Sequence, residues 1–158
     1  MLNRPAIDWV LWVIDAWLVL GFAGIATLRQ FQLVARVLFP LGGFAGLVLA
    51  VVALQGLVGR AEVAVLPLGL PELPFHLRLD SLAAFFLFII GAASFGISLF
   101  AAGYFRKGEG TPPGLLCFEF HIFLASMALV VLADDAYAFM MAWEVMALSS
   151  YFLVTANH

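Results

Sequence analysis

Charged residues are scarce in this chain: only 11% of its 158 residues are Asp, Glu, Lys or Arg, against about 25% in an ordinary soluble domain. Hydrophobic residues make up 65%, which is more apolar surface than a folded domain of this length can hide from water. This excludes a soluble globular enzyme, and the high hydrophobicity also excludes a disordered chain. Lipid is the remaining solvent, and about 20 apolar residues per helix leave room for five spans.

Cysteine and basic residues are also few. Cys117 is the single cysteine, so the chain forms no internal disulfide and no cysteine-based metal cluster. The net charge is only −3, and the seven Lys and Arg residues are scattered, which argues against a nucleic-acid partner. The sequence contains no nucleotide-binding loop, no Ser/His/Asp set and no metal-ligand spacing, so we expect no bound cofactor and no catalysis by this chain alone.

Five long apolar stretches predict an all-α integral membrane protein. The predicted spans cover about residues 9–28, 37–59, 81–103, 115–133 and 136–156. Asp80 offers an N-cap for the third span, and the pair Asp134–Asp135 makes a very short turn before the fifth. Gly42 and Gly46 in the second span have a spacing that allows close helix packing in lipid.

The segment between the second and third spans, about residues 61–80, has a different pattern. Residues 75–80 alternate between apolar and polar side chains, which is typical of a half-buried strand, and residues 62–66 are a second candidate strand. Four turn-forming residues interrupt the stretch between them, as a wide hairpin loop would: Pro67, Gly69, Pro71 and Pro74. We expect a small β-hairpin on one membrane face, and an irregular extended loop is the alternative.

Basic residues in short loops predict the orientation, because cytoplasmic loops carry an excess of Lys and Arg. With the N-terminus outside, the inner loops hold Arg29, Arg36, Arg106 and Lys107. The outer segments then hold three arginines, diluted over a longer loop, together with five acidic residues: Glu62, Glu72, Asp80, Asp134 and Asp135. We therefore predict an outside N-terminus with Arg106 and Lys107 inside.

Four ionisable residues fall inside the predicted spans, where each costs about 2.5–3.5 kcal/mol and needs a reason: Asp15, Glu119, His121 and Glu144. Glu144 lies near mid-depth of the fifth span, with no basic residue within one helical turn of it. We expect it to pack against the fourth span. Burial favours its neutral, proton-carrying form, as a proton relay requires; the alternative is a structural Glu hydrogen-bonded in a helix interface.

Glu119 and His121 lie about one turn inside the predicted inner end of the fourth span. Being two residues apart, they point about 200° away from each other and are not a facing pair. Glu119 either takes part in proton transfer or extends to the membrane surface. His121 titrates near neutral pH and shares a helix face with Cys117 and Leu124, so it either carries protons or is a core histidine. For Asp15 no facing partner is visible, and we expect no function.

Two runs of residues carry a family resemblance: Ala-Asp-Asp-Ala at 133–136 and Trp-Glu-Val-Met-Ala-Leu-Ser-Ser-Tyr-Phe-Leu at 143–153. They resemble the antiporter-like membrane subunits shared by respiratory complex I, Mrp sodium/proton antiporters and group 4 membrane-bound hydrogenases. Residues 123–134 are similar to the fourth span of that family, and residues 80–86 to the start of its third. The second run is most similar to the hydrogenase-4 and formate hydrogenlyase branch. The resemblance covers about residues 75–158 well and the first two spans only in layout.

The resemblance implies about fourteen spans, an outside N-terminus and an outer hairpin before the third span. It also implies that Glu144 is the proton-channel glutamate of the fifth span, which works with a lysine on a later, seventh span. In this sequence the only lysine is Lys107, in a loop, and residue 158 follows directly after the fifth span. We therefore expect residues 1–158 to be an N-terminal fragment or truncated product of such a subunit.

The function implied by the resemblance is that of a non-catalytic, proton-translocating membrane subunit. The complex would be a hydrogenase-4, formate hydrogenlyase or NADH:quinone oxidoreductase type in a prokaryotic inner membrane. The expected partners are the lipid bilayer, other membrane subunits, and a peripheral electron-transfer arm that carries the iron–sulfur clusters and metal centre. Two alternatives are open: an Mrp-type sodium/proton antiporter subunit, and a membrane scaffold without transport.

Overall fold

The computed structural model describes residues 4–104 and 111–156. The long helices are α1 (Ala6–Ala26), α3 (Phe39–Val58), α4 (Ser81–Tyr104), α5 (Pro113–Leu132) and α6 (Ala136–Thr155). The shorter elements are helix α2 (Phe31–Leu33), the π-helical turn η1 (Val34–Leu38), and strands β1 (Glu62–Leu70) and β2 (Leu73–Leu79). Among the described residues, five helical segments are long and apolar enough to cross a bilayer. The predicted all-α membrane class is confirmed.

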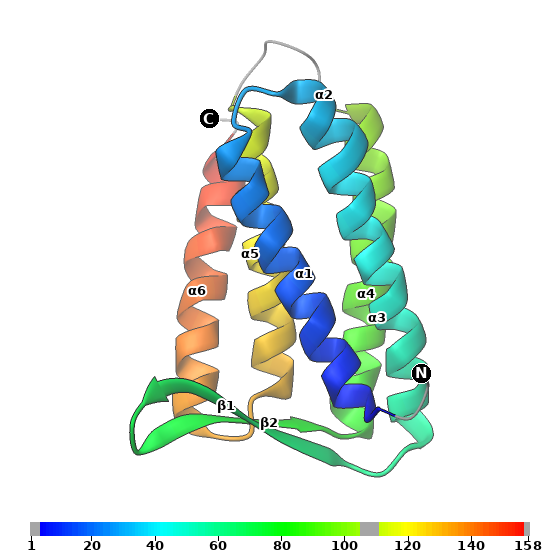
Figure 1. Cartoon of the computed structure of the whole chain (residues 1–158), viewed down its shortest axis with the longest axis vertical. Helices are drawn as coiled ribbons and strands as arrows, with labels where there is room; N and C mark the ends of the chain where they lie inside the picture. Colours follow the sequence, from blue (N-terminus) through cyan, green and yellow to red (C-terminus); the bar gives the residue numbers. More distant parts are fainter. Residues whose placement is uncertain (1–3, 105–110, 157–158) are drawn as a thin grey trace.

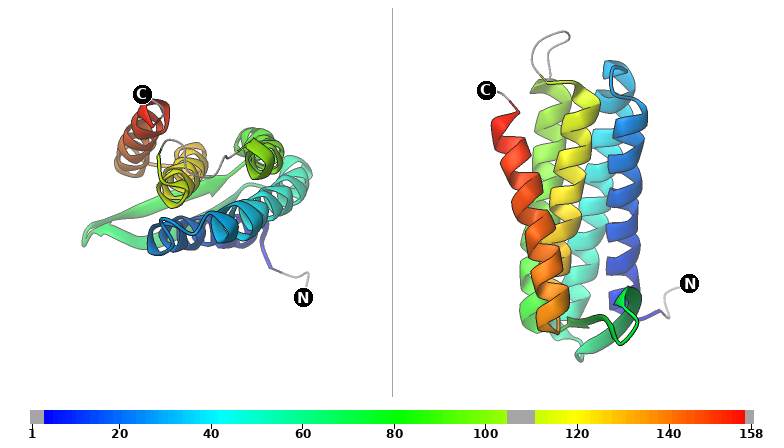
Figure 2. Two further views of the ribbon diagram at one scale, coloured as in Figure 1. Left: turned by 90° about the horizontal axis from the view of Figure 1, so that it is seen from above. Right: turned by 90° about the vertical axis from the view of Figure 1, so that its left-hand side faces the viewer.

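The long helices stand side by side in two rows, and the β-hairpin lies across one end of the bundle (Figure 1). Seen along the bundle, α4, α5 and α6 form one row, and α1 and α3 form the other (Figure 2). Consecutive helices run in opposite directions, so the start of α1, the end of α3 and the start of α6 all lie at the hairpin end. The tightest packing joins α3 to α4 and α5 to both α1 and α6, whereas α6 packs mainly against α5 alone.

The second span is longer than predicted. Helix runs without a break from Phe31 to Val58, so Arg36, expected before the span, lies inside η1. The π-helical turn ends two residues before Pro40, which has no backbone N–H to donate to the carbonyl four residues earlier. A wider turn, in which the Phe39 N–H donates to the Val34 carbonyl, lets the helix continue. The exposed Arg36 lies close enough to the helix end to extend its head group toward the membrane surface.

Both predicted strands are present, which overturns the irregular-loop alternative. The prediction of a wide loop between the strands was wrong, because strand pairing continues to Leu70 and Leu73 and leaves a two-residue turn at 71–72. Prolines are tolerated because each strand of a two-stranded sheet has a free edge, and the register shifts between Leu66 and Gly69. Gly69 adopts a positive φ of 108°, a conformation that favours glycine.

Acidic side chains connect the hairpin end to the helices. The predicted N-cap at Asp80 is confirmed, since its Oδ1 accepts a 2.8 Å hydrogen bond from the backbone N–H of Ala83. Asp135 caps α6 in the same way, 2.7 Å from the N–H of Ala138. At the start of α1 the N–H of Ile7 donates to the carboxylate of Glu62 at 2.7 Å. These bonds satisfy N–H groups that have no partner within their own helix.

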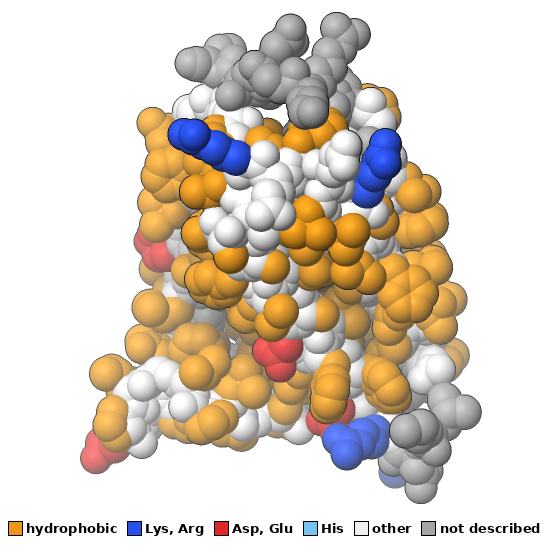
Figure 3. All heavy atoms as spheres, turned by 45° about the horizontal axis from the view of Figure 1, so that its top comes forward, with side chains coloured by type: hydrophobic (Ala, Val, Ile, Leu, Met, Phe, Trp, Pro, Cys, Tyr) orange, Lys and Arg blue, Asp and Glu red, His pale blue; other side chains and the backbone are white. Residues whose placement is uncertain are grey.

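The sides of the bundle are apolar and its basic residues lie at its ends. Figure 3 shows hydrophobic side chains over most of one face, with Lys and Arg only toward its two ends and a few acidic side chains between them. Large apolar side chains such as Trp12, Phe22 and Phe44 are more than half exposed. A surface of this kind suits lipid or another membrane helix and not water.

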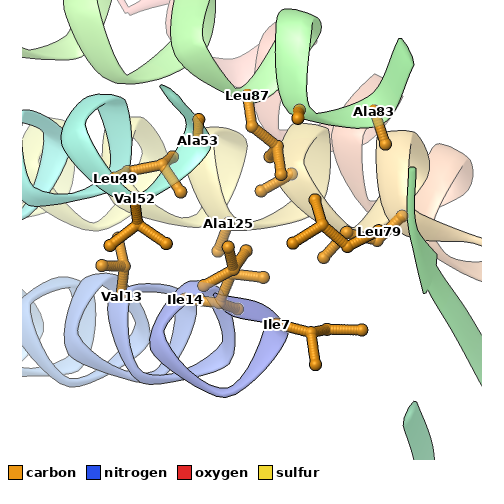
Figure 4. Packing of buried hydrophobic residues seen from close by; sticks show 14 of the residues in the cluster. Ile7, Val13, Ile14, Leu49, Val52, Ala53, Leu79, Ala83, Leu87 and Ala125 are labelled. Atoms are coloured by element: carbon orange, nitrogen blue, oxygen red, sulfur yellow. The ribbon is translucent and has the colours of Figure 1, made fainter. Parts of the chain in front are cut away.

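The main cluster of buried hydrophobic side chains joins four helices and β2 (Figure 4). Leu49 and Ala53 of α3 pack near Leu87 of α4, and β2 contributes Leu77 and Leu79, both buried. The predicted packing role of the second-span glycines is confirmed. A Cβ at Gly46 would collide with Ser94 of α4, and the carbonyl of Gly42 accepts a 3.1 Å hydrogen bond from Trp17 Nε1 of α1.

Candidate functional site

Glu144 lies eight residues after the start of α6, on the side of the helix that faces away from α5. The residues of α6 that are buried are Ala138, Ala142 and Ser149, and Glu144 lies about 200° around the helix from Ala142. Its side chain is exposed, and no salt bridge or hydrogen bond to it is present in residues 4–104 and 111–156. The expected packing of Glu144 against the fourth span is therefore wrong, because α6 presents its small residues to α5.

Glu119 is buried in the second turn of α5, with only 8% of its surface exposed. Within the described chain its Oε2 has no hydrogen-bond partner, and its burial argues against the alternative in which it extends to the membrane surface. Thr111, two residues before α5, donates to the carbonyl of Ala156 at the end of α6. This antiparallel register places Glu119 at about the height of Ser149, which is also buried and donates to the Met146 carbonyl at 3.0 Å.

His121 is completely buried where α5 meets α1 and α3. Its Nδ1 lies 2.7 Å from the carbonyl oxygen of Cys117, and because a carbonyl only accepts, this contact assigns the ring proton to Nδ1. Nε2 has no hydrogen-bond partner among the described residues and points at Gly42, where a Cβ would overlap it. The rings of Phe39 and Phe120 pack nearby, at centroid distances of 5.7 and 5.4 Å.

The structure does not bring the three predicted residues together. Glu144 faces away from α5, whereas Glu119 and His121 lie on different sides of α5, as their two-residue spacing predicts. The surroundings of His121 are those of a packed core histidine with one satisfied nitrogen. No group of three or more His, Cys, Asp or Glu side chains within the described ranges is placed to hold a metal ion.

The sequence reasoning missed a polar contact between the hairpin and the turn before α6. Arg78 Nε lies 3.0 Å from Asp134 Oδ1, and His76 Nδ1 lies 3.2 Å from Asp135 Oδ2. Hydrogen bonds from the backbone of Ala138 and then of His76 hold the pKa of Asp135 below its ordinary value of 3.8. A signal was present: His76 and Arg78 are two residues apart and so share one face of the strand.

Five helices long and apolar enough to cross a bilayer, among the described residues, define this chain as part of an integral membrane protein. No protein-family model matches it. The chain is 33% identical over 141 residues to hydrogenase-4 component B of Escherichia coli (strain K12), covering 86% of this chain and 21% of that protein. It is 35% identical over 81 residues to NADH-quinone oxidoreductase subunit L of the same organism, covering 51% of this chain and 13% of that protein. For subunit L of Mycobacterium tuberculosis (strain CDC 1551 / Oshkosh) the identity is 31% over 90 residues, covering 56% of this chain and 14% of that protein.

The chain thus spans between 13% and 21% of the length of these relatives. Their names agree with two of the three groups in the resemblance, the group 4 hydrogenases and respiratory complex I. The similarities support the antiporter-like superfamily over part of each relative.

Proposed function

We propose that this chain belongs to a proton-translocating membrane subunit of a hydrogenase-4 or NADH-quinone oxidoreductase type of complex, and that Glu144 carries the proton. The observation that carries the proposal is the position of this carboxyl. It lies eight residues, or about 12 Å, from the hairpin end of α6, too far for a Glu side chain to reach water. An acid at this depth is costly unless it has a function or a partner.

The exposed side of α6 suits such a role. Because α6 packs mainly against α5, Glu144 is open to contact with a further helix. A carboxyl surrounded by apolar groups holds its proton, and a cation approaching within about 4–6 Å favours the ionised form. A basic side chain that advances and retreats beside Glu144 would therefore unload and reload the proton.

Glu119 is the subsidiary candidate in this proposal. It is buried, has an oxygen without a partner among the described residues, and lies at about the height of Ser149, five residues along α6 from Glu144. Since Glu144 is on the far side of α6 from α5, a proton passing between the two carboxyls needs a water path around α6. His121 is the weakest of the three candidates, because its ring is packed against Gly42 and its Nδ1 is already bonded.

The test is proton uptake by vesicles that contain the full-length complex, measured beside redox turnover. We expect Glu144→Gln to assemble normally, because volume and shape are kept, and to lose most proton uptake. Glu144→Asp should keep part of it, and Glu119→Gln should cause a smaller loss. Glu72→Gln in the hairpin turn is the matched control, since the same change is made outside the spans.

The same vesicles separate the other functions. If Glu144→Gln moves the normal number of protons per electron, Glu144 is not a proton carrier and a scaffold role is favoured. Sodium/proton exchange that runs without redox turnover would favour an Mrp-type antiporter subunit over an oxidoreductase subunit.

A further inference from the structure

Asp15 is a second exposed acid in the middle of a spanning helix, and the proton relay does not use it. Nine residues separate it from Ala6 and eleven from Ala26, so at 1.5 Å per residue it lies about 13 Å and 16 Å from the helix ends. Its side chain is exposed, and the described structure shows no hydrogen bond or ion pair to it. Unlike Lys or Arg, aspartate is too short to extend its charge to the membrane surface.

The side of α1 that carries Asp15 faces away from the bundle. Trp12 and Val19 share this side at helical spacing and are 65% and 67% exposed. Asp15 lies nine residues, or about 180°, from Gly24, which packs against Cys117 of α5. An ionisable group that faces hydrocarbon is costly, so this side is better covered by protein than by lipid.

The same helix cannot cover both Asp15 and Glu144. Helices α1 and α6 belong to different rows of the bundle (Figure 2), and each of the two acids points away from α5, which packs between them. The Asp15 side therefore needs an occupant of its own.

A second copy of this chain does not fit as that occupant. A symmetric contact through this side would bring two Asp15 carboxylates together. The arginines of the described chain lie at or near the ends of the spans and not at mid-depth: Arg4, Arg29, Arg36, Arg60 and Arg78.

We propose that the side of α1 formed by Trp12, Asp15 and Val19 binds a spanning helix of a neighbouring subunit, which places a Lys or Arg opposite Asp15. Charge complementarity at a depth that the Asp15 carboxyl cannot leave gives the contact its register. The choice of a neighbouring subunit rests on the proposed place of this chain in a multi-subunit complex.

Photo-crosslinking in native membranes tests the contact. A benzophenone amino acid at Trp12 is compared with one at Val51 of α3, which is 53% exposed among apolar neighbours and lies at a similar distance from the hairpin end. We expect Trp12 to give an adduct with another subunit, mapped to a helix that contains Lys or Arg, and Val51 to give lipid adducts. Lipid adducts alone at Trp12, an adduct within the same polypeptide, or an adduct with a helix lacking a basic residue would overturn the proposal.

Charge replacement gives a second readout. We expect Asp15→Leu and Asp15→Asn each to reduce the amount of assembled complex several-fold, because both leave the partner cation buried without a counter-charge. Asp8→Asn in the first turn of α1 is the matched control and should not. Replacing the mapped Lys or Arg by Leu should restore assembly of Asp15→Leu. Normal assembly of Asp15→Leu would contradict the contact. If Asp15→Leu assembles poorly but Asp15→Asn assembles normally, a basic partner is ruled out.

These results are independent of the relay. Loss of proton uptake in Glu144→Gln with only lipid adducts at Trp12 would overturn the α1 contact and leave the proposed function standing. Normal proton uptake in Glu144→Gln, together with an adduct between Trp12 and a basic helix of another subunit, would overturn the relay and leave the α1 contact standing.

Discussion

His76 of β2 and Asp135, the N-cap of α6, hold the hairpin against the bundle. Oδ2 of Asp135 lies 2.9 Å from the backbone N of His76 and 3.2 Å from its ring Nδ1. The backbone N–H of Asp134 donates to the His76 carbonyl at 2.8 Å, and Arg78 pairs with the Asp134 carboxylate. One carboxylate thus both starts α6 and fixes the hairpin across the end of the bundle (Figure 1).

We predict that acid loosens this contact. The pKa of Asp135 in the folded chain is below its ordinary value of 3.8, mainly because of the hydrogen bond from Ala138 and then that from His76. A lowered folded-state pKa means that the stabilisation is complete above the ordinary value and is lost as the pH falls through the folded one. Hydrogen exchange at the His76 and Ala138 amides, corrected for intrinsic rates, measures this loss.

Asp135→Asn is the control for the acid effect, because it keeps an acceptor oxygen and removes the titration. Its protection should not change with pH over the same interval. Wild-type protection that is constant from about pH 5 to about pH 2 would contradict a role for the ionised carboxylate.

Gly91 and Gly96 of α4 offer a matched pair for testing the approach of α3 to α4. A Cβ at Gly91 would lie 2.5 Å from the Gly46 carbonyl oxygen and 2.7 Å from the backbone N of Ala50, whereas a Cβ at Gly96 meets nothing within 4 Å. We expect Gly91→Ala to lower the free energy of unfolding by about 1–3 kcal/mol through overpacking. Gly96→Ala should leave it unchanged or raise it by up to about 1 kcal/mol, because Ala favours helix.

Equilibrium unfolding of both glycine variants in mixed micelles checks this prediction. A Gly91→Ala variant as stable as Gly96→Ala, with no loss in either, would show that α3 and α4 are further apart than the structure has them.

The orientation of the bundle in the membrane is the third prediction. The turn residue Glu72 lies at the hairpin end, and Gln30 follows α1 at the opposite end. Since Arg29 and Arg36 flank Gln30, we expect that end to face the cytoplasm. The predicted inside pair Arg106 and Lys107 lies outside the described residues.

Cysteine labelling in intact cells tests the orientation, in a chain where the buried Cys117 is replaced by Ala. A membrane-impermeant maleimide should label Glu72→Cys directly and Gln30→Cys only after the membrane is opened. The reverse pattern would place the N-terminus inside.

The positions of the elements could be predicted from residues 1–158 because their signals are local. Long apolar runs define the spans, alternation in residues 75–80 predicts a strand, and Asp80 before an apolar run predicts a helix start. The observed boundaries differ from the predicted ones where a local backbone feature changes the helix. Near Pro40, a π-helical turn extends the second span so that it includes Arg36.

Which side of each helix faces a neighbour was decided only by the tertiary structure. In a soluble helix the polar side marks the surface, but the spans here are apolar all round, so periodicity carries little information about which side is buried. Glu144 was therefore placed correctly near the middle of α6 along its length but on the wrong side of that helix, and the burial of Glu119 was left open. By itself, the sequence determined how far along its helix each ionisable group lies. Helix packing decided which of them is enclosed by the bundle and which, like Asp15 and Glu144, is exposed on its side.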